Sequence, residues 1–336
     1  MAKSPSPSTA DYLQPWFKEG NVILVADEKC FRVHRDILSS YSHIFEDMFL
    51  CPQPSGAGSD TEESIDGCPV VRLPDAASHV QIALQAMYDR GYMNGFTYPM
   101  PFSVLTAFLR LGEKYEIKTL YNEAKARLAK CYPSSVTDLT SAKESMKNSL
   151  TGSDPHHFRV INVAREVGLL SVLPAAMYLC LLECPPQTIS DGYETSDGHC
   201  SLSPANQSVC IAVQDSLASL RRQSFQWLGA SQFARLQSHR STRNACSDKP
   251  ECLSGAHTIL TELFFRTSLV DPLADWREDW DEHFCDNCSV VARRQYGEAR
   301  VALWASLPRI FGLGQSWTEL EQNERKFDLE IDSSDT

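Results

Sequence analysis

Apolar residues near the start of the chain are arranged as in a short β-hairpin. Residues 21–26 (NVILVA) form a run rich in β-branched side chains, and residues 30–34 alternate, with Phe31 and Val33 on one face. The polar residues 27–29 between them have the length of a tight connection. The two runs are therefore predicted to pair as antiparallel strands.

Helical periodicity follows this hairpin. Apolar positions at i, i+3 and i+4 come after Ser42, which can cap a helix; they are Phe45, Met48 and Phe49. A longer stripe follows Ser78, a candidate N-cap, and comprises Val80, Ala83, Leu84, Met87 and Tyr88. With a short strand at 70–73 and two more helical stripes at 105–115 and 120–128, residues 16–133 are predicted to form an α+β domain.

The remainder of the chain has a mainly helical pattern. Residues 134–155 are polar, with weak helical character in their middle, and are interpreted as a linker. Residues 156–320 carry successive apolar stripes separated by polar inserts. Residues 1–15 are interpreted as a disordered leader, and residues 321–336 as an acidic tail. The predicted architecture is an α+β domain followed by an α-helical C-terminal region.

Charge and composition narrow the function. The 336 residues include 31 Lys and Arg against 43 Asp and Glu, a formal net charge of −12, which argues against binding driven by nucleic-acid phosphates. No stretch approaches the apolar length of a membrane span, and the N-terminus lacks the apolar core of a secretory signal. We therefore expect an intracellular protein, cytoplasmic or nuclear, whose twelve cysteines are reduced thiols or metal ligands.

The sequence gives little support for catalysis. It contains no Gly-rich phosphate loop, no GxSxG and no HExxH. His156 and His157 are adjacent, so they cannot share one helical face, and they are interpreted as a solvated pair before a helix. His34 and Arg35 are interpreted as a polar pair that joins a strand to a helix. We expect that the chain is not an enzyme.

Cysteines late in the chain carry the strongest chemical signal. Cys285 and Cys288 form a CxxC motif, and Cys246 and Cys252 lie about 35 residues upstream. Two pairs of thiolates can complete a tetrahedral zinc site, so one interpretation is a zinc-braced subregion at 246–288. Because five residues separate the first pair, where two to four are usual, reduced thiols without metal are a second interpretation. A redox CxxC is the third, although no thioredoxin-like βαβ pattern surrounds it.

Three segments of the N-terminal domain resemble a BTB (POZ) domain. Residues 21–49 resemble its opening, a hairpin, then V-H-R-x-x-L, then S-x-x-F-x-x-M-F. Residues 70–93 are similar to its strand–helix unit, and residues 104–128 to its last helical pair. The resemblance covers about a third of the chain. Downstream, residues 161–180 and 285–313 resemble a group of fungal BTB-containing proteins whose helical C-terminal regions are functionally undefined.

This resemblance implies protein–protein recognition. The expected partners are a second copy of the chain, a cullin-type ubiquitin-ligase scaffold, or a substrate protein. The resemblance places such contacts around Phe45, Met48, Met87, Tyr88 and Tyr92. Asn21 stands where many members carry an Asp that, in some transcription-factor members, is associated with a charged pocket at the dimer face. This departure argues against that style of dimerisation.

Two alternatives stay open. The chain could be a nuclear transcription-regulatory protein, in which a zinc-supported helical region and basic residues such as Arg293 and Arg294 contact nucleic acid. It could also be an enzyme that uses Cys285 with His283. In the zinc interpretation, His283 and His257 are instead spare nitrogen ligands for the metal.

Overall fold

The computed structural model describes residues 11–50, 64–89, 91–92, 99–151, 157–195, 198–229, 233, 246–266 and 271–332. The chain divides into two compact units. The sheet unit comprises Met1–Cys131 and Ser145–Ser153, and the helical unit comprises Tyr132–Glu144 and Asp154–Thr336. The chain therefore leaves the sheet unit after residue 131, returns to it after residue 144 and leaves it again after residue 153.

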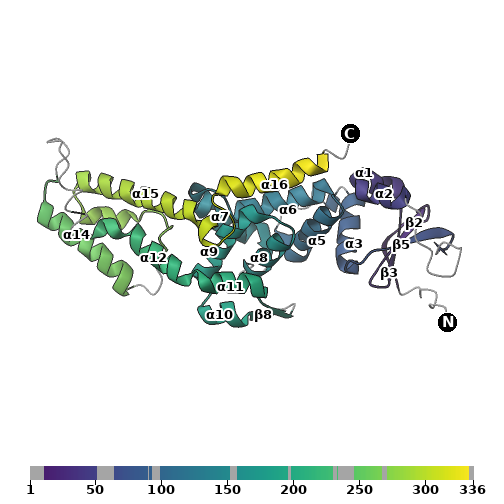
Figure 1. Ribbon diagram of the computed structural model, residues 1–336, viewed down its shortest axis with the longest axis horizontal. Helices are drawn as coiled ribbons and strands as arrows, with labels where there is room; N and C mark the ends of the chain where they lie inside the picture. Colours follow the sequence, from purple (N-terminus) through teal and green to yellow (C-terminus); the bar gives the residue numbers. More distant parts are fainter. Residues whose placement is uncertain are drawn as a thin grey trace. The chain divides into compact units, whose positions relative to one another are not determined.

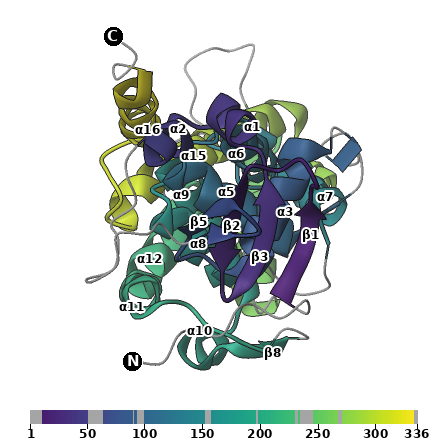
Figure 2. The same cartoon turned by 90° about the vertical axis from the view of Figure 1, so that its right-hand side faces the viewer.

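A five-stranded sheet in the order β1-β3-β2-β5-β4 forms the base of the sheet unit (Figure 2). Its strands are β1 (Tyr12–Trp16), β2 (Val22–Ala26), β3 (Lys29–Val33), β4 (Ser64–Ile65) and β5 (Cys68–Arg72). β2 and β3 pair antiparallel, which confirms the predicted hairpin, and Asp27 and Glu28 form its two-residue turn at positive φ. β1 joins β3, and β5 joins β2, in parallel.

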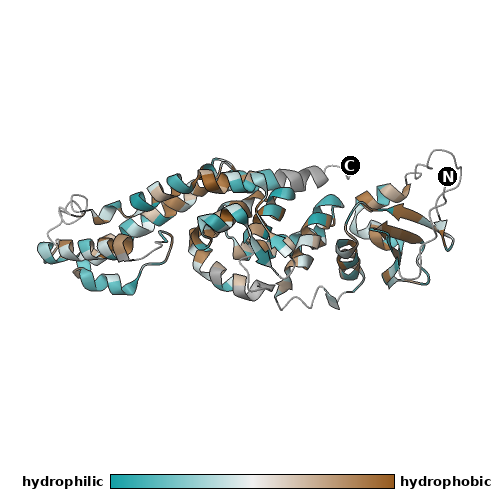
Figure 3. Cartoon of the chain, turned by 90° about the horizontal axis from the view of Figure 1, so that it is seen from below, coloured by the Kyte–Doolittle hydropathy of each residue, from teal (hydrophilic) through white to brown (hydrophobic). Residues whose placement is uncertain are grey.

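Strand β2 is buried at all five positions. Ile23 and Val25 pack on one face of the sheet, in a cluster with residues of β3 and β5. Leu24, on the other face, lines an apolar core space together with Phe45 and Leu84 from the helices. Apolar side chains on both faces agree with the brown colour that predominates in the strands of the sheet unit in Figure 3.

Five helices complete the described part of this unit (Figure 1). They are α1 (Arg35–Tyr41), α2 (His43–Leu50), α3 (Ala77–Tyr88), α5 (Phe102–Lys114) and α6 (Lys118–Cys131), and a small parallel pair is formed by β6 (Met100–Pro101) and β7 (Leu150–Thr151). The predicted cap at Ser78 is wrong, because α3 begins at Ala77, whose amide donates to Asp27 Oδ2 at 2.9 Å. A side chain from the hairpin turn thus caps this helix.

Helices dominate the second unit (Figure 1). Its elements are η3 (Val136–Asp138), α7 (Leu139–Ser149, which continues into the sheet unit), α8 (His157–Glu166), η4 (Leu170–Val172), α9 (Leu173–Glu183), α10 (Pro186–Asp191), β8 (Tyr193–Thr195), β9 (Gly198–Cys200), α11 (Pro204–Ala212), α12 (Gln214–Ser224), η5 (Gln226–Leu228), α14 (Lys249–Thr261), η6 (Glu262–Arg266), η7 (Glu278–His283), α15 (Asp286–Ile310) and α16 (Trp317–Asp332). The predicted helical C-terminal region is confirmed. Among the described residues, none of the helices has the length and apolar character needed to cross a bilayer.

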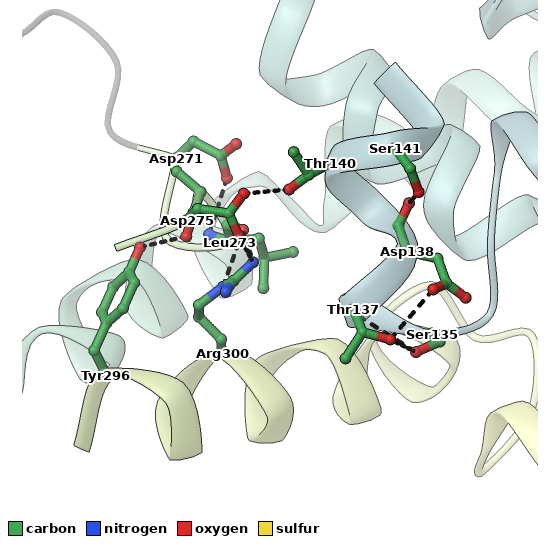
Figure 4. Close-up of polar contacts among 11 residues, drawn as sticks. Ser135, Thr137, Asp138, Thr140, Ser141, Asp271, Leu273, Asp275, Tyr296 and Arg300 are labelled. Carbon is green, nitrogen blue, oxygen red and sulfur yellow. Dashed lines mark hydrogen bonds and ion pairs between the residues drawn. The ribbon is translucent and has the colours of Figure 1, made fainter. Parts of the chain in front are cut away.

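The predicted linker at 134–155 is largely helical instead. Leu139 and Ala142 of α7 are buried, and Thr140 donates a hydrogen bond to Asp275 (Figure 4). Arg300 of α15 holds Asp275 at 2.9 Å and the Leu273 carbonyl oxygen at 2.9 Å (Figure 4). Tertiary contacts therefore stabilise a segment whose own sequence is too polar to predict a packed helix.

Two terminal predictions also need correction. Within the predicted leader, Tyr12 opens strand β1, and residues 1–10 lie outside the described part of the chain. The predicted tail begins inside α16, which extends to Asp332. Leu320 is fully buried and Glu324 accepts hydrogen bonds from Ser171, so α16 is anchored on η4 of the same helical unit.

Helices α5 and α6 approach each other closely at Gly112. A Cβ at this position would lie 2.8 Å from the backbone nitrogen of Tyr121 and 2.9 Å from its Cβ. By contrast, a Cβ on Gly297 of α15 would point into open space. The two glycines, both inside helices, therefore make opposite predictions for substitution by alanine.

We expect Gly112→Ala to destabilise the sheet unit by about 1–3 kcal/mol, because backbone must move to admit the methyl group. Gly297→Ala, the control, is expected to gain up to about 1 kcal/mol from helix propensity. Scanning calorimetry of both variants would measure the two changes in Tm. An unchanged Tm for Gly112→Ala would contradict the close packing of α5 on α6.

Candidate functional site

The five residues predicted to surround a protein interface divide into two groups. Phe45 and Met87 are 3% and 6% exposed, and the Phe45 ring stacks on Tyr115 at 4.6 Å. These two side chains belong to the core, so they support a surface and do not form one. Met48, Tyr88 and Tyr92 are half-buried. Their part in partner binding remains a prediction.

Tyr88 joins the start of α1 to the end of α3. Its hydroxyl accepts a hydrogen bond from the His34 amide at 2.8 Å, and its ring stacks on Phe17 at 4.6 Å. Burial raises the pKa of Tyr88, so the phenol stays neutral. The next amide, that of Arg35, donates to Asn21 Oδ1 at 2.8 Å. His34 and Arg35 thus join strand to helix, as the sequence indicated.

Ser42 fixes the direction of α2. Its buried hydroxyl accepts from the Phe45 amide at 3.1 Å and donates to the Tyr115 carbonyl oxygen. His43, the first residue of α2, lies 3.1 Å from a Glu116 carboxylate oxygen. The predicted cap is confirmed, and the same side chain also ties α2 to the end of α5.

The end of α2 presents apolar side chains at the surface. Leu50 is 75% exposed, and Met48 and Phe49 are half-buried beside it in the sequence. The Arg35 guanidinium lies 5.6 Å from the centre of the Phe49 ring. We call Met48, Phe49 and Leu50 the α2 tip. The sequence signal for Leu50 was its position outside the stripe of Phe45, Met48 and Phe49. On a helix, this position directs the apolar side chain away from the core.

These observations define a class: a small α+β module in which helices cover a buried sheet and one helix ends in exposed apolar side chains. Residues 13–131 match the model of the BTB/POZ domain family. The chain therefore contains an N-terminal BTB/POZ domain, a protein–protein interaction module, followed by a helical region. A search of the curated proteins finds no match for this chain.

A second candidate site lies in the helical unit, where four cysteines from distant segments meet. Cys246 precedes α14, Cys252 lies in its first turns, Cys285 caps α15, and Cys288 follows one turn later. Their four Sγ atoms all lie within 4.8 Å of one another. The structure thus brings together the four predicted ligands, whereas His257 and His283 are not members of this group.

The cysteine cluster has an uneven electrostatic character. Burial raises the pKa of the Cys252 thiol to about 11 and also raises that of Cys288. Burial acts in the same direction on Cys285, but hydrogen bonds from Cys288 and Ser247 outweigh it and lower the pKa of Cys285 to about 6. Donors from Cys288 in the first turn of α15 and from Ser247 before α14 therefore favour a thiolate at that position.

A glycine places the two halves of the cysteine cluster against each other. A Cβ on Gly255 of α14 would lie 2.1 Å from the His283 carbonyl oxygen, two residues before Cys285. Cys252 and Cys288 also belong to an aromatic core cluster with Trp280 and Tyr296. Sequence spacing suggested the cysteines, but this close approach could not be read from it.

His157 was expected in a solvated pair and is instead buried. Its Nδ1 lies 3.0 Å from the Tyr132 hydroxyl and its Nε2 lies 2.9 Å from a Glu183 oxygen. Both ring nitrogens have polar partners, which is why a histidine can occupy this position. His156 lies outside the described residues.

We expect Ser42→Ala to destabilise the BTB/POZ domain by about 1–3 kcal/mol, because the Phe45 amide and the Tyr115 carbonyl would lose a buried partner. Ser40→Ala is the matched control, since the Ser40 hydroxyl is exposed and donates only to the nearby Ile37 carbonyl oxygen. Denaturant unfolding followed by circular dichroism would measure both. Equal stability of the two variants would contradict the anchoring role of Ser42.

Proposed function

We propose that the protein is a non-enzymatic adaptor whose BTB/POZ domain docks onto a cullin-type ubiquitin-ligase scaffold while the helical unit contacts a substrate protein. The observation that carries this proposal is the α2 tip, an apolar end of a helix held rigidly by Ser42 and by the Phe45 ring. Exposed apolar side chains on a fixed base are the usual core of a protein interface.

Docking on a scaffold is favoured over dimerisation through a charged pocket. Asn21 is neutral, and its side-chain oxygen is occupied by the Arg35 amide. Strand β1 pairs with β3 of the same chain, which supports a domain that is complete without a strand from a second copy.

The helical unit offers apolar side chains for a second partner. Phe265 is 82% exposed, Val290 69% and Val301 58%. Large apolar side chains at this exposure are candidates for contacts with another polypeptide, and a phenyl ring is a strong anchor when it enters a pocket. We propose that the substrate protein binds this unit.

The alternatives have weaker support. For nucleic-acid binding, Arg293 pairs with Asp281, Arg294 lies 3.9 Å from Glu298, and Arg300 holds Asp275, so these three charges are partly neutralised within the chain. For catalysis, the described partners of Cys285 are other cysteines and Ser247, and His283 is not among them. An adaptor of this class would act inside the cell, in the cytoplasm or the nucleus.

Leu50→Asp in the full chain is expected to weaken binding to a cullin-type scaffold by about tenfold or more, because a carboxylate would be buried at an apolar contact. Val301→Asp, at an exposed position of α15, is the matched control and should bind the scaffold as the wild type does. Biolayer interferometry against a panel of purified cullin scaffolds measures both affinities.

Two further measurements separate the alternatives. Light scattering after size exclusion would show a dimer that Leu50→Asp converts to a monomer if the α2 tip serves self-association instead. DNA binding that falls steeply with salt would favour the nuclear regulator. Wild-type protein that binds none of the scaffolds would overturn the adaptor proposal.

A further inference from the structure

We propose that Cys246, Cys252, Cys285 and Cys288 bind one structural Zn²⁺ ion as a closed, four-thiolate site. This site lies in the helical unit and does not rest on the adaptor function. Its four sulfur atoms come from two segments of the chain and lie within 4.8 Å of one another.

The sulfur positions match a tetrahedral zinc shell. With Zn–S bonds of about 2.3 Å, the sulfurs of such a shell lie about 3.8 Å apart. The Sγ atoms of Cys246 and Cys285 are 3.9 Å apart. An all-sulfur tetrahedral set selects Zn²⁺ or iron among common metals, and four protein ligands leave no open position for a substrate. The site is therefore structural in character.

Surrounding groups suit thiolate ligands. The Cys285 amide donates to Cys252 Sγ at 3.2 Å, and amides that donate to ligating sulfurs offset part of their negative charge. Cys285 and Cys288 occupy the start of the 25-residue helix α15, where the free amides and the helix dipole favour negative charge. Cys252 and Cys288 are 2% and 6% exposed, so water has little access to these sulfurs.

The unusual spacing of the first cysteine pair also has a local explanation. Asp248 lies between Cys246 and Cys252 and caps α14, with its carboxylate accepting from the Glu251 amide at 3.1 Å. Cys246 therefore approaches from the extended chain, and Cys252 from inside the helix. The five residues between Cys246 and Cys252 are explained by the start of α14, which lies between these two ligands.

A bound ion would join the start of α14 to the start of α15. It would close the loop between Cys246 and Cys285, which are 39 positions apart in the sequence. A cross-link over a long loop reduces the conformational freedom of the unfolded chain, so metal binding would stabilise this part of the helical unit.

Elemental analysis of the full chain, purified with reductant and without chelator, is the direct test. We expect about one zinc ion per chain, falling at least about tenfold in Cys285→Ser and in Cys288→Ser. Cys200→Ser is the matched control, because Cys200 is a buried cysteine of the same unit outside the cluster and should leave the zinc content unchanged.

A second measurement keeps the proposal testable if the serine variants do not fold. Removal of metal from the wild type with a chelator should lower Tm, and added Zn²⁺ should restore it; Co²⁺ in its place should give the visible absorption of a tetrahedral thiolate complex. Wild-type protein without zinc, iron at the site in place of zinc, or disulfide bonds among these cysteines in freshly purified protein would each overturn the proposal.

Discussion

The BTB/POZ domain depends on the complete burial of strand β2. All five of its residues pair with β3 and three of them, Ile23 to Val25, pair with β5, and both faces of the strand meet apolar side chains. A displacement by one residue would interchange the side chains of two differently packed layers, because Ile23 and Val25 pack on one face and Leu24 on the other. Pairing and packing together therefore fix the position of the hairpin turn, from which Asp27 caps α3.

The parts of the fold that were predictable from sequence are those in which apolar residues recur with the regular spacing of a strand or a helix. Alternation in the hairpin and the stripe from Val80 to Tyr88 gave the correct elements, although Asp27, distant in sequence, supplied the cap expected from Ser78. The helix at Leu139–Ser149 had only a weak helical signal within the predicted linker, because its stability comes from contacts such as that between Thr140 and Asp275, 135 residues away.

The candidate sites were predictable to different degrees. Cysteine spacing is sufficient to nominate four ligands, since CxxC places two sulfurs at one helix start, but the meeting of the two pairs requires Gly255 against the backbone of His283. The interface residues taken from family likeness mixed core with surface, because a pattern of apolar residues does not say which of them a neighbouring helix covers. Leu50 lies off the apolar stripe of α2, but its 75% exposure became evident only from the packing of that helix.

The chain crosses between the two units three times, and this limits how the units can be separated or exchanged by recombination. Strand β7, encoded after the first segment of the helical unit, pairs with β6 of the BTB/POZ domain, and Tyr132–Glu144 belongs to the other unit. A gene fusion or stop codon at any single point between the two would leave one unit without part of its own chain. Residues 132–153 therefore contain parts of both units in alternation. Recombination at one point in this region cannot exchange either unit without also transferring a fragment of the other.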